Sequence, residues 1–362
     1  MNIKGNLKYL VAGATLFLLV YLFLAAVPIG PDFYFEPSWI LTLPDESLPH
    51  DEQTEPQIFP ENAEPFVLGD TFGFFSPNGT VLYTQKTEDR IAISKHGWAT
   101  YPYDAHKTTL HFTDTTPEYT LCEPGYVHLD DGHIYLFHPG GNRVSRHLPN
   151  GDRLWIREHT APITAFNCSA AGTVIGYADG NLTAIAPDGS ELFTFWPGGS
   201  DQQIILGVSI SEDGSHIACI SGINQQRFIV ASRMSNQYRI LYHTYLKGNL
   251  RRQAYINFEK SGRYAFFETH NGLGIFDSKT KESRIIPLSG RVLSTGDYPG
   301  DSLFVVLTQN GEDYTLSAIE QPDHLVATAN FSGKNAFLVQ RSNVVYLGIN
   351  DHITRINIRG IE

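Results

Sequence analysis

The sequence predicts an all-β fold assembled from a repeated unit. The chain has 362 residues, 12% of them aromatic, with 32 glycines and 20 prolines. Such a composition is typical of short strands joined by tight turns, because aromatic side chains suit a pleated surface and glycine suits turns that need positive φ. Apolar and polar residues alternate at residues 180–186 (GNLTAIA) and 344–349 (VVYLGI). No stretch after residue 70 keeps a helical apolar period, so helices are expected to be nearly absent there.

A glycine-containing turn between two apolar segments recurs along the chain. The turns lie at residues 75–79, 130–132, 169–172, 211–214, 260–262, 298–300 and 331–333. Their last glycines are 53, 40, 42, 48, 38 and 33 residues apart. These spacings match a four-stranded blade of a β-propeller better than a helical or leucine-rich repeat.

The repeat predicts a seven-bladed β-propeller over residues 66–362, with six to eight blades compatible with the irregular spacings. The long first spacing predicts an insertion near residues 104–120. An open ring would leave unpaired strand edges, so we expect residues 66–75 to close it against strands around residues 344–358.

The central repeats carry a family resemblance. The runs NGDRLW (150–155) and PITAFNCSAAGTVIGYADGNLTAIAPDGSELFTFWPGG (162–199) resemble the PQQ-like and WD40-like β-propeller repeat. The turns at 75–79 and 331–334 are similar to the FSPDGK turn of WD40-like repeats. In PQQ enzymes an adjacent cysteine pair, a stacking tryptophan and acidic calcium ligands surround the cofactor. This chain has no adjacent cysteines and only four tryptophans, so no cofactor is expected.

Charge is concentrated in the N-terminal part of the chain. The formal net charge is −12, yet residues 28–70 hold ten acidic and no basic residues. After residue 70 the chain has 24 basic and 28 acidic residues. Phosphate binding requires clustered Lys and Arg, so nucleic acid is not expected as a partner.

The N-terminal 29 residues predict a membrane signal-anchor. Residues 9–29 carry no charge, and residues 10–27 are long and apolar enough to cross a bilayer. Lys4 and Lys8 precede this run and acidic residues follow it, so residues 1–8 are expected in the cytoplasm and the propeller in the periplasm or outside the cell. A signal peptide cleaved near Ala25 and Ala26 is the alternative.

Residues 30–65 are predicted to be a linker, aromatic at first and then acidic and proline-rich. Its aromatic residues are Phe33, Tyr34, Phe35 and Trp39. They suit an interfacial belt in the headgroup region. They also suit a docking segment for a membrane or envelope protein, because exposed aromatic segments mark contact sites. These four residues are the predicted partner-binding site.

The densest group of potential metal ligands surrounds one turn. It comprises His128, Asp130, Asp131 and His133, with His138 beyond. Asp131 and Gly132 are explained by a hairpin turn, so no metal site is predicted, although two ligands could face each other across the hairpin. The three cysteines are Cys122, Cys168 and Cys219, without metal-ligand spacing. We expect small buried strand residues, with a Cys168–Cys219 disulfide as the alternative.

The function predicted from these observations is a membrane-tethered, non-catalytic scaffold that binds protein partners. Propellers present variable loops on a rigid disc, which suits binding. The chain has no G-x-S-x-G elbow, P-loop or GxGxxG motif before a helix. The alternative is an exported propeller enzyme, a hydrolase, lyase or oxidoreductase, with its site at the channel mouth. Converging carboxylates, His or Arg at that mouth would indicate an enzyme, whereas an aromatic face would indicate binding.

Overall fold

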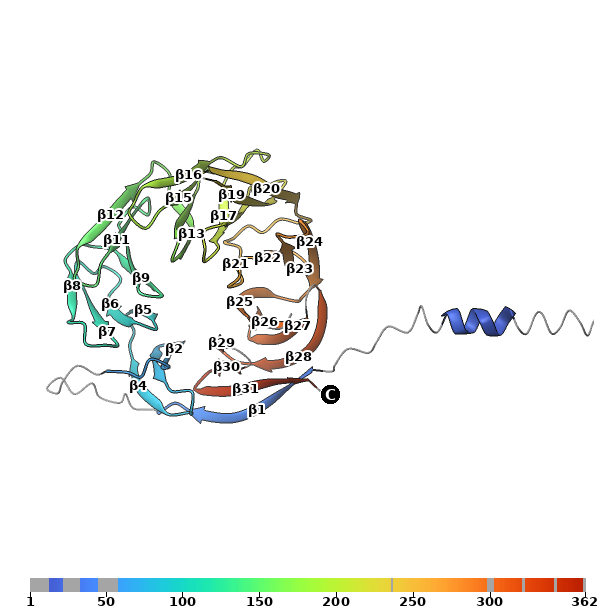
Figure 1. The fold of residues 1–362 in the computed structure, drawn as a ribbon. Coiled ribbons are helices and arrows are strands. Elements are labelled where there is room, and N and C mark those ends of the chain that lie inside the picture. Colours follow the sequence, from blue (N-terminus) through green and yellow to red (C-terminus); the bar gives the residue numbers. More distant parts are fainter. Residues whose placement is uncertain are drawn as a thin grey trace, which may run out of the picture.

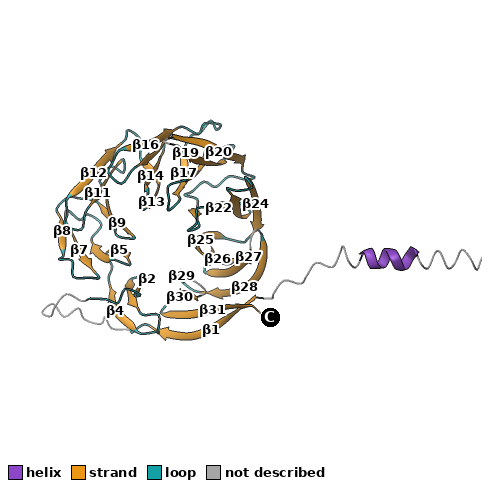
Figure 2. Cartoon of the chain, in the orientation of Figure 1, coloured by secondary structure: helices purple, strands orange, loops and turns teal. Residues whose placement is uncertain are grey.

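The computed structural model describes residues 13–21, 33–44, 58–235, 237–297, 303–320, 323–341 and 344–360. In these ranges the regular structure consists of strands, apart from one helix at residues 13–21. Figure 2 shows this distribution. The predicted all-β fold is confirmed.

The described residues form eight antiparallel sheets, arranged as the blades of a closed ring in Figure 1. The first four blades consist of β2 (Glu64–Leu68), β3 (Thr71–Phe75) and β4 (Val81–Lys86); β5 (Arg90–Ser94), β6 (Gly97–Tyr101), β7 (Thr108–Phe112) and β8 (Tyr119–Leu121); β9 (Tyr126–Asp130), β10 (His133–Phe137), β11 (Arg143–His147) and β12 (Arg153–Glu158); and β13 (Ile163–Ser169), β14 (Gly172–Tyr177), β15 (Leu182–Ile185) and β16 (Glu191–Phe195).

The last four blades complete the ring. They consist of β17 (Ile205–Ile210), β18 (His216–Ser221), β19 (Arg227–Met234) and β20 (Gln237–Tyr245); β21 (Ile256–Phe258), β22 (Tyr264–Thr269), β23 (Gly272–Asp277) and β24 (Glu282–Pro287); β25 (Arg291–Asp297), β26 (Leu303–Asn310), β27 (Asp313–Glu320) and β28 (His324–Ser332); and β29 (Ala336–Arg341), β30 (Val344–Ile349) and β31 (His352–Gly360) with β1 (Phe33–Thr42). The first strand of each blade lies nearest the central axis (Figure 1).

The predicted count of seven blades is wrong. The long spacing near residues 104–120 is no insertion, because residues 90–121 form the whole second blade, β5 to β8. Its first turn, Ser-Lys-His-Gly at 94–97, lacks the Asp-Gly or Asn-Gly signal used for counting. The turn at 331–333 joins two blades instead of lying within one. The turn at 298–300 lies outside the described residues.

Ring closure uses a strand that the sequence placed outside the propeller. β1 pairs antiparallel with β31, from Phe33 opposite Gly360 to Thr42 opposite His352. The closing segment is therefore residues 33–42 and not residues 66–75, which pack sheet to sheet against the last blade. The predicted boundary at residue 66 is corrected accordingly, since pairing with β31 removes an edge that would otherwise be open. Residues 45–57 of the predicted linker lie outside the described part.

The seam between the first and last blades is tied by a bidentate ion pair. Arg341, the last residue of β29, donates from Nε and Nη2 to the two carboxylate oxygens of Glu64 at 2.7 and 2.8 Å. Glu64 is the first residue of β2, whereas Gly69, just after β2, lies against Asn335, just before β29. The two inner strands therefore run in opposite directions.

The core lies between neighbouring blades. Stacked aromatic pairs bridge several interfaces, among them Phe228 on Phe267 with ring centroids 3.8 Å apart. Trp155 packs between the third and fourth blades, and Phe193 packs on Tyr238 of the fifth. Large side chains between the blades thus fix the disc as a rigid frame for its loops.

The helix at residues 13–21 covers only part of the predicted signal-anchor. The described residues contain no helix with the length and apolar character needed to cross a membrane. This finding contradicts the predicted transmembrane helix over residues 9–29 and the single-pass localisation derived from it.

Candidate functional site

Exposed aromatic residues gather on one face of the disc. In each four-stranded blade from β5 to β28 the outer strand ends on the face where the inner strand begins, because the strands alternate in direction. We call this side the aromatic face; its residues are Arg90, Tyr103, Tyr126, Trp196, Arg227 and Tyr245. They form two patches, each built around an arginine.

The first patch lies on the second and third blades. The guanidinium carbon of Arg90 is 4.1 Å from the ring centroid of Tyr103 and 6.0 Å from that of Tyr126. Tyr103 is 83% exposed, and Tyr126 stacks on Phe137 with ring centroids 4.6 Å apart. Arg90 therefore orders two tyrosines that come from different blades.

The second patch lies on the fourth and fifth blades. The guanidinium carbon of Arg227 is 5.4 Å from the ring centroid of Tyr245, the residue opposite it in the sheet. The Nη1 of Arg227 donates to the carbonyl of Pro197 at 3.3 Å. This bond ties the patch to the loop that begins at Trp196, which is 54% exposed.

A cavity of about 200 Å³ lies at the inner strands of the fourth to seventh blades. Residues of β13, β17 and β25 line it, together with residues 253–256. Among its described lining residues one side chain is charged, that of Arg291. Catalysis by acid–base groups needs partners within hydrogen-bond reach of one another, and the lining of this cavity offers no such pair.

A larger cavity of about 750 Å³ lies at the seam of the ring. Its lining includes Asp70 and Lys86 of the first blade and Lys334 and Asp351 beside the last. Charges of both signs are interspersed around it. This arrangement favours a solvated groove over a site selective for one charge.

The predicted partner-binding residues lie on β1. Phe33, Phe35 and Trp39 are half-buried against the blades, whereas Tyr34 is 42% exposed. The Nε1 of Trp39 donates to the carbonyl of Pro77 at 3.2 Å. Three of the four aromatic side chains thus hold the closing strand in place, and Tyr34 alone of the four faces outward.

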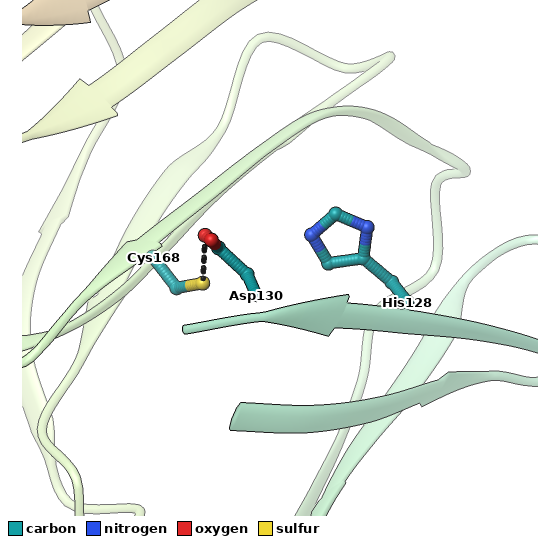
Figure 3. Close-up of side chains that lie close together, drawn as sticks. All are labelled: His128, Asp130 and Cys168. Atoms are coloured by element: carbon teal, nitrogen blue, oxygen red, sulfur yellow. Dashed lines mark hydrogen bonds between the residues drawn. The ribbon is translucent and has the colours of Figure 1, made fainter. Parts of the chain in front are cut away.

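The structure brings together two of the potential metal ligands noted in the sequence. His128 and Asp130 lie on the same face of β9, and Cys168 reaches them from β13 of the next blade (Figure 3). The Sγ of Cys168 donates to Oδ2 of Asp130 at 3.1 Å. Candidate ligand atoms of all three residues lie within 4.8 Å of one another.

The other residues of that sequence cluster are not part of this three-residue group. Asp131 has φ of 38° in the hairpin turn, as the turn prediction requires. Its Oδ1 lies 3.4 Å from Nε2 of His96. His133 lies opposite Asp130 and therefore on the same face of the sheet, but it is not among the residues whose ligand atoms lie within 4.8 Å of one another. His138 is buried and its Nε2 is hydrogen-bonded to Ser145 at 2.8 Å.

Burial sets the protonation states in the cluster. Burial, and then the charge of Asp130, raises the pKa of the Cys168 thiol, which is therefore protonated. Burial lowers the pKa of His128, while the charge of Asp130 acts in the opposite direction. The imidazole is therefore neutral near pH 7 and has a free lone pair on one ring nitrogen.

A family model described as "beta-propeller protein" matches residues 1–362. The chain belongs to the β-propeller protein family. It is 37% identical over 366 residues to an uncharacterized protein of Treponema pallidum (strain Nichols), with all of this chain and 97% of that protein covered.

Two solved structures share the fold of this β-propeller protein. One is BamB from Moraxella catarrhalis, with a TM-score of 0.59 and 12% identity, covering 90% of this chain and 100% of that one. The other is a chain of a mitotic checkpoint complex, with a TM-score of 0.54 and 10% identity, covering 91% and 94%. At these identities the likeness shows the fold alone, and the predicted propeller is confirmed.

Sequence reasoning did not place Cys168 beside His128 and Asp130 in this β-propeller protein. Cys168 and Cys219 are both free, so the alternative of a disulfide between them is wrong. Cys168 lies on β13 and its contact with Asp130 crosses the interface between two blades, for which one sequence gives no signal.

Proposed function

We propose that this β-propeller is a non-catalytic scaffold that binds a protein partner through its aromatic face. The main observation in support is the pair of Arg–Tyr patches, one centred on Arg90 and the other on Arg227. Trp, Tyr and Arg are the residue types enriched at the energetic centres of protein interfaces. Here the tyrosines and Trp196 are exposed, the two arginines are half-buried beside them, and all lie on one side of a rigid disc.

Preorganisation supports the proposal. Arg90 and Arg227 pack on tyrosine rings and restrict their rotamers, so less side-chain entropy is lost when a partner covers them. Tyr126 is further fixed by stacking on Phe137. An aromatic residue as exposed as Tyr103 leaves much apolar area for a partner to bury.

The structural neighbours agree with a binding role at the level of the fold. The mitotic checkpoint complex contains a chain of this fold, so such a disc can take part in a protein assembly. The alternative, an enzyme acting at the channel mouth, has less support. The cavity of about 200 Å³ at the inner strands of the fourth to seventh blades has Arg291 as its one charged residue, and its described lining contains neither a carboxylate nor a histidine.

A second contact on β1 remains part of the proposal. Tyr34 is the exposed member of the predicted docking segment. The other three aromatic residues pack against the propeller, so their replacement would disturb the fold as well as any docking. Tyr34→Ala is therefore the substitution that isolates a docking role for this segment.

The proposal is tested by mild cross-linking and co-purification of the full chain from its native source. The double variant Tyr103→Ala/Trp196→Ala removes an anchor from each patch. Because one interface hot spot contributes about 2 kcal/mol or more, the double variant should recover the specific partner at least about tenfold less efficiently. Far-ultraviolet circular dichroism should show an unchanged fold.

The matched control is Leu148→Ala/Met234→Ala. Both residues are exposed. Leu148 follows β11 and Met234 ends β19, the third strands of their blades, so both lie on the face opposite the aromatic face. This control should keep full recovery. Full recovery with the aromatic-face variant, together with loss in the control or in Tyr34→Ala, would contradict docking on the aromatic face.

A further inference from the structure

One group of metal-ligating side chains stands out among the residues that the structure describes. We propose that His128, Asp130 and Cys168 bind a zinc ion that joins the third blade to the fourth. The three side chains come from the inner strands of neighbouring blades, and their ligand atoms lie within 4.8 Å of one another. This inference is independent of the proposed partner-binding role.

The distances are close to those that zinc requires. With bonds of about 2.0–2.3 Å, two ligand atoms of a tetrahedral zinc ion lie about 3.5 Å apart. Cys168 Sγ and Asp130 Oδ2 are 3.1 Å apart. His128 stands two residues before Asp130 on β9, so both side chains leave the same face of the strand. Rotations about side-chain bonds that move atoms by about 1 Å would complete three coordination bonds.

The charges balance when zinc binds. The metal replaces the proton of the Cys168 thiol, which passes to solvent, and the thiolate and the Asp130 carboxylate then neutralise the two positive charges of the ion. The neutral imidazole of His128 donates a lone pair. A site without net charge is suited to the half-buried place between two blades.

The donor set selects the class of metal. A thiolate and an imidazole favour zinc and other borderline-soft ions over magnesium or calcium, which prefer oxygen ligands. Three protein ligands leave a fourth position, which water would fill.

Aromatic residues form the wall of the cluster. The ring of His128 lies 5.6 Å from that of Phe166 and 6.4 Å from that of Tyr135. The Oη of Tyr135 is hydrogen-bonded to Thr173 at 2.7 Å, which fixes its ring. These contacts restrict the orientation of His128 and limit the access of water, and both effects raise the affinity of a metal site.

Cobalt(II) is the probe for this site, because it replaces zinc and its bond to a thiolate absorbs in the near ultraviolet. The full chain is treated with a chelator, dialysed and titrated with Co²⁺. We expect the thiolate band to saturate at one equivalent and to disappear when Zn²⁺ is added. Cys168→Ser should abolish the band, and Asp130→Asn should weaken Co²⁺ binding at least about tenfold.

Two matched controls come from the same region of the fold. Cys219→Ser changes a buried, free cysteine outside the cluster, and His133→Gln changes a histidine on the same hairpin. Both should keep the band and the stoichiometry. Zn²⁺ should also raise the melting temperature of the wild type but not that of Cys168→Ser.

Two results would overturn the assignment. One is a wild-type chain, shown to be folded by circular dichroism, that gives no cobalt–thiolate band. The other is a band that survives in Cys168→Ser and is lost in Cys219→Ser or Cys122→Ser. If Cys168→Ser does not fold, the Asp130→Asn variant tests the site instead. An unchanged Co²⁺ affinity in this nearly isosteric variant would also contradict the assignment.

Discussion

A buried carboxylate organises the junction between the sixth and seventh blades. Glu268 is 1% exposed and accepts two hydrogen bonds from Arg252, at 2.8 and 2.7 Å. It also accepts the backbone N–H groups of Tyr255 and Val292, at 3.2 and 3.0 Å. One side chain thus connects the start of β21 with the start of β25, and its donors would lose their partner if it were removed.

Glu268→Ala should therefore be strongly destabilising. The substitution removes a buried acceptor from two backbone N–H groups and from the partly exposed Arg252 guanidinium, and we expect the free energy of unfolding to fall by about 3 kcal/mol. Thermal unfolding followed by circular dichroism would show a melting temperature lower by several degrees.

The control is Arg263→Ala, which breaks the ion pair with Asp277 on the surface. The Arg263–Asp277 pair has the same bidentate form, but the Asp277 side chain is 15% exposed, against 2% for that of Glu268. Its loss should cost about 1 kcal/mol or less. Equal effects of the two substitutions would show that Glu268 has no special role at the blade junction.

At the scale of elements, β1 decides how the ring closes. Trp39 joins β1 to the first blade, since its ring packs on Phe75 and its Nε1 donates to the carbonyl of Pro77, and it also packs on Tyr346 of the last blade. Trp39→Ala should lower the free energy of unfolding by about 3 kcal/mol, because it leaves a cavity at the seam and removes a hydrogen bond. Tyr34→Ala, on the exposed side of the same strand, should have little effect on stability.

Hydrogen exchange of the β31 amides would test this role of Trp39. Exchange should accelerate in Trp39→Ala if β1 detaches more often from its partner strand. A variant with unchanged melting temperature and unchanged exchange in β31 would show that Trp39 does not hold the closing strand.

Local features of these elements were predictable from the sequence, and long-range pairings were not. Asp131 and Gly132 have φ of 38° and 80°, as a tight hairpin turn requires. The dipeptide Asp-Gly is typical of such a turn. In the sequence, β1 follows the apolar residues 10–27. Its aromatic residues therefore fitted an interfacial membrane belt as well as they fitted a strand of the propeller. Its partner strand β31 begins at His352, and one sequence gives no signal for a pairing over that separation.

The candidate sites likewise contain residues that the sequence indicates and residues that only the fold brings together. His128 and Asp130 were recognised because they are two residues apart in the sequence. Cys168 joins them from another blade, and its contact depends on how the blades are placed. The aromatic face was missed for the same reason: Arg90 meets Tyr126 only because their strands lie side by side around the ring.

At the scale of the whole molecule, eight blades and a closing N-terminal strand produce a disc with two different faces. Rigid packing between blades confines variation to the loops and strand ends, which suits recognition. Arg–Tyr patches from four successive blades share one face. A partner that covers both patches would be held across about half of the ring.

The central claim is that a protein partner binds the aromatic face. Hydrogen–deuterium exchange of the full chain, with and without its co-purified partner, tests it most directly, because a bound partner slows exchange where it covers the backbone. We predict slower exchange at the loops around Tyr103 and Trp196 and at the end of β20. The claim would be contradicted if slower exchange were confined to β1 or to the turns near Leu148 and Met234. It would also be contradicted if no part of the propeller exchanged more slowly.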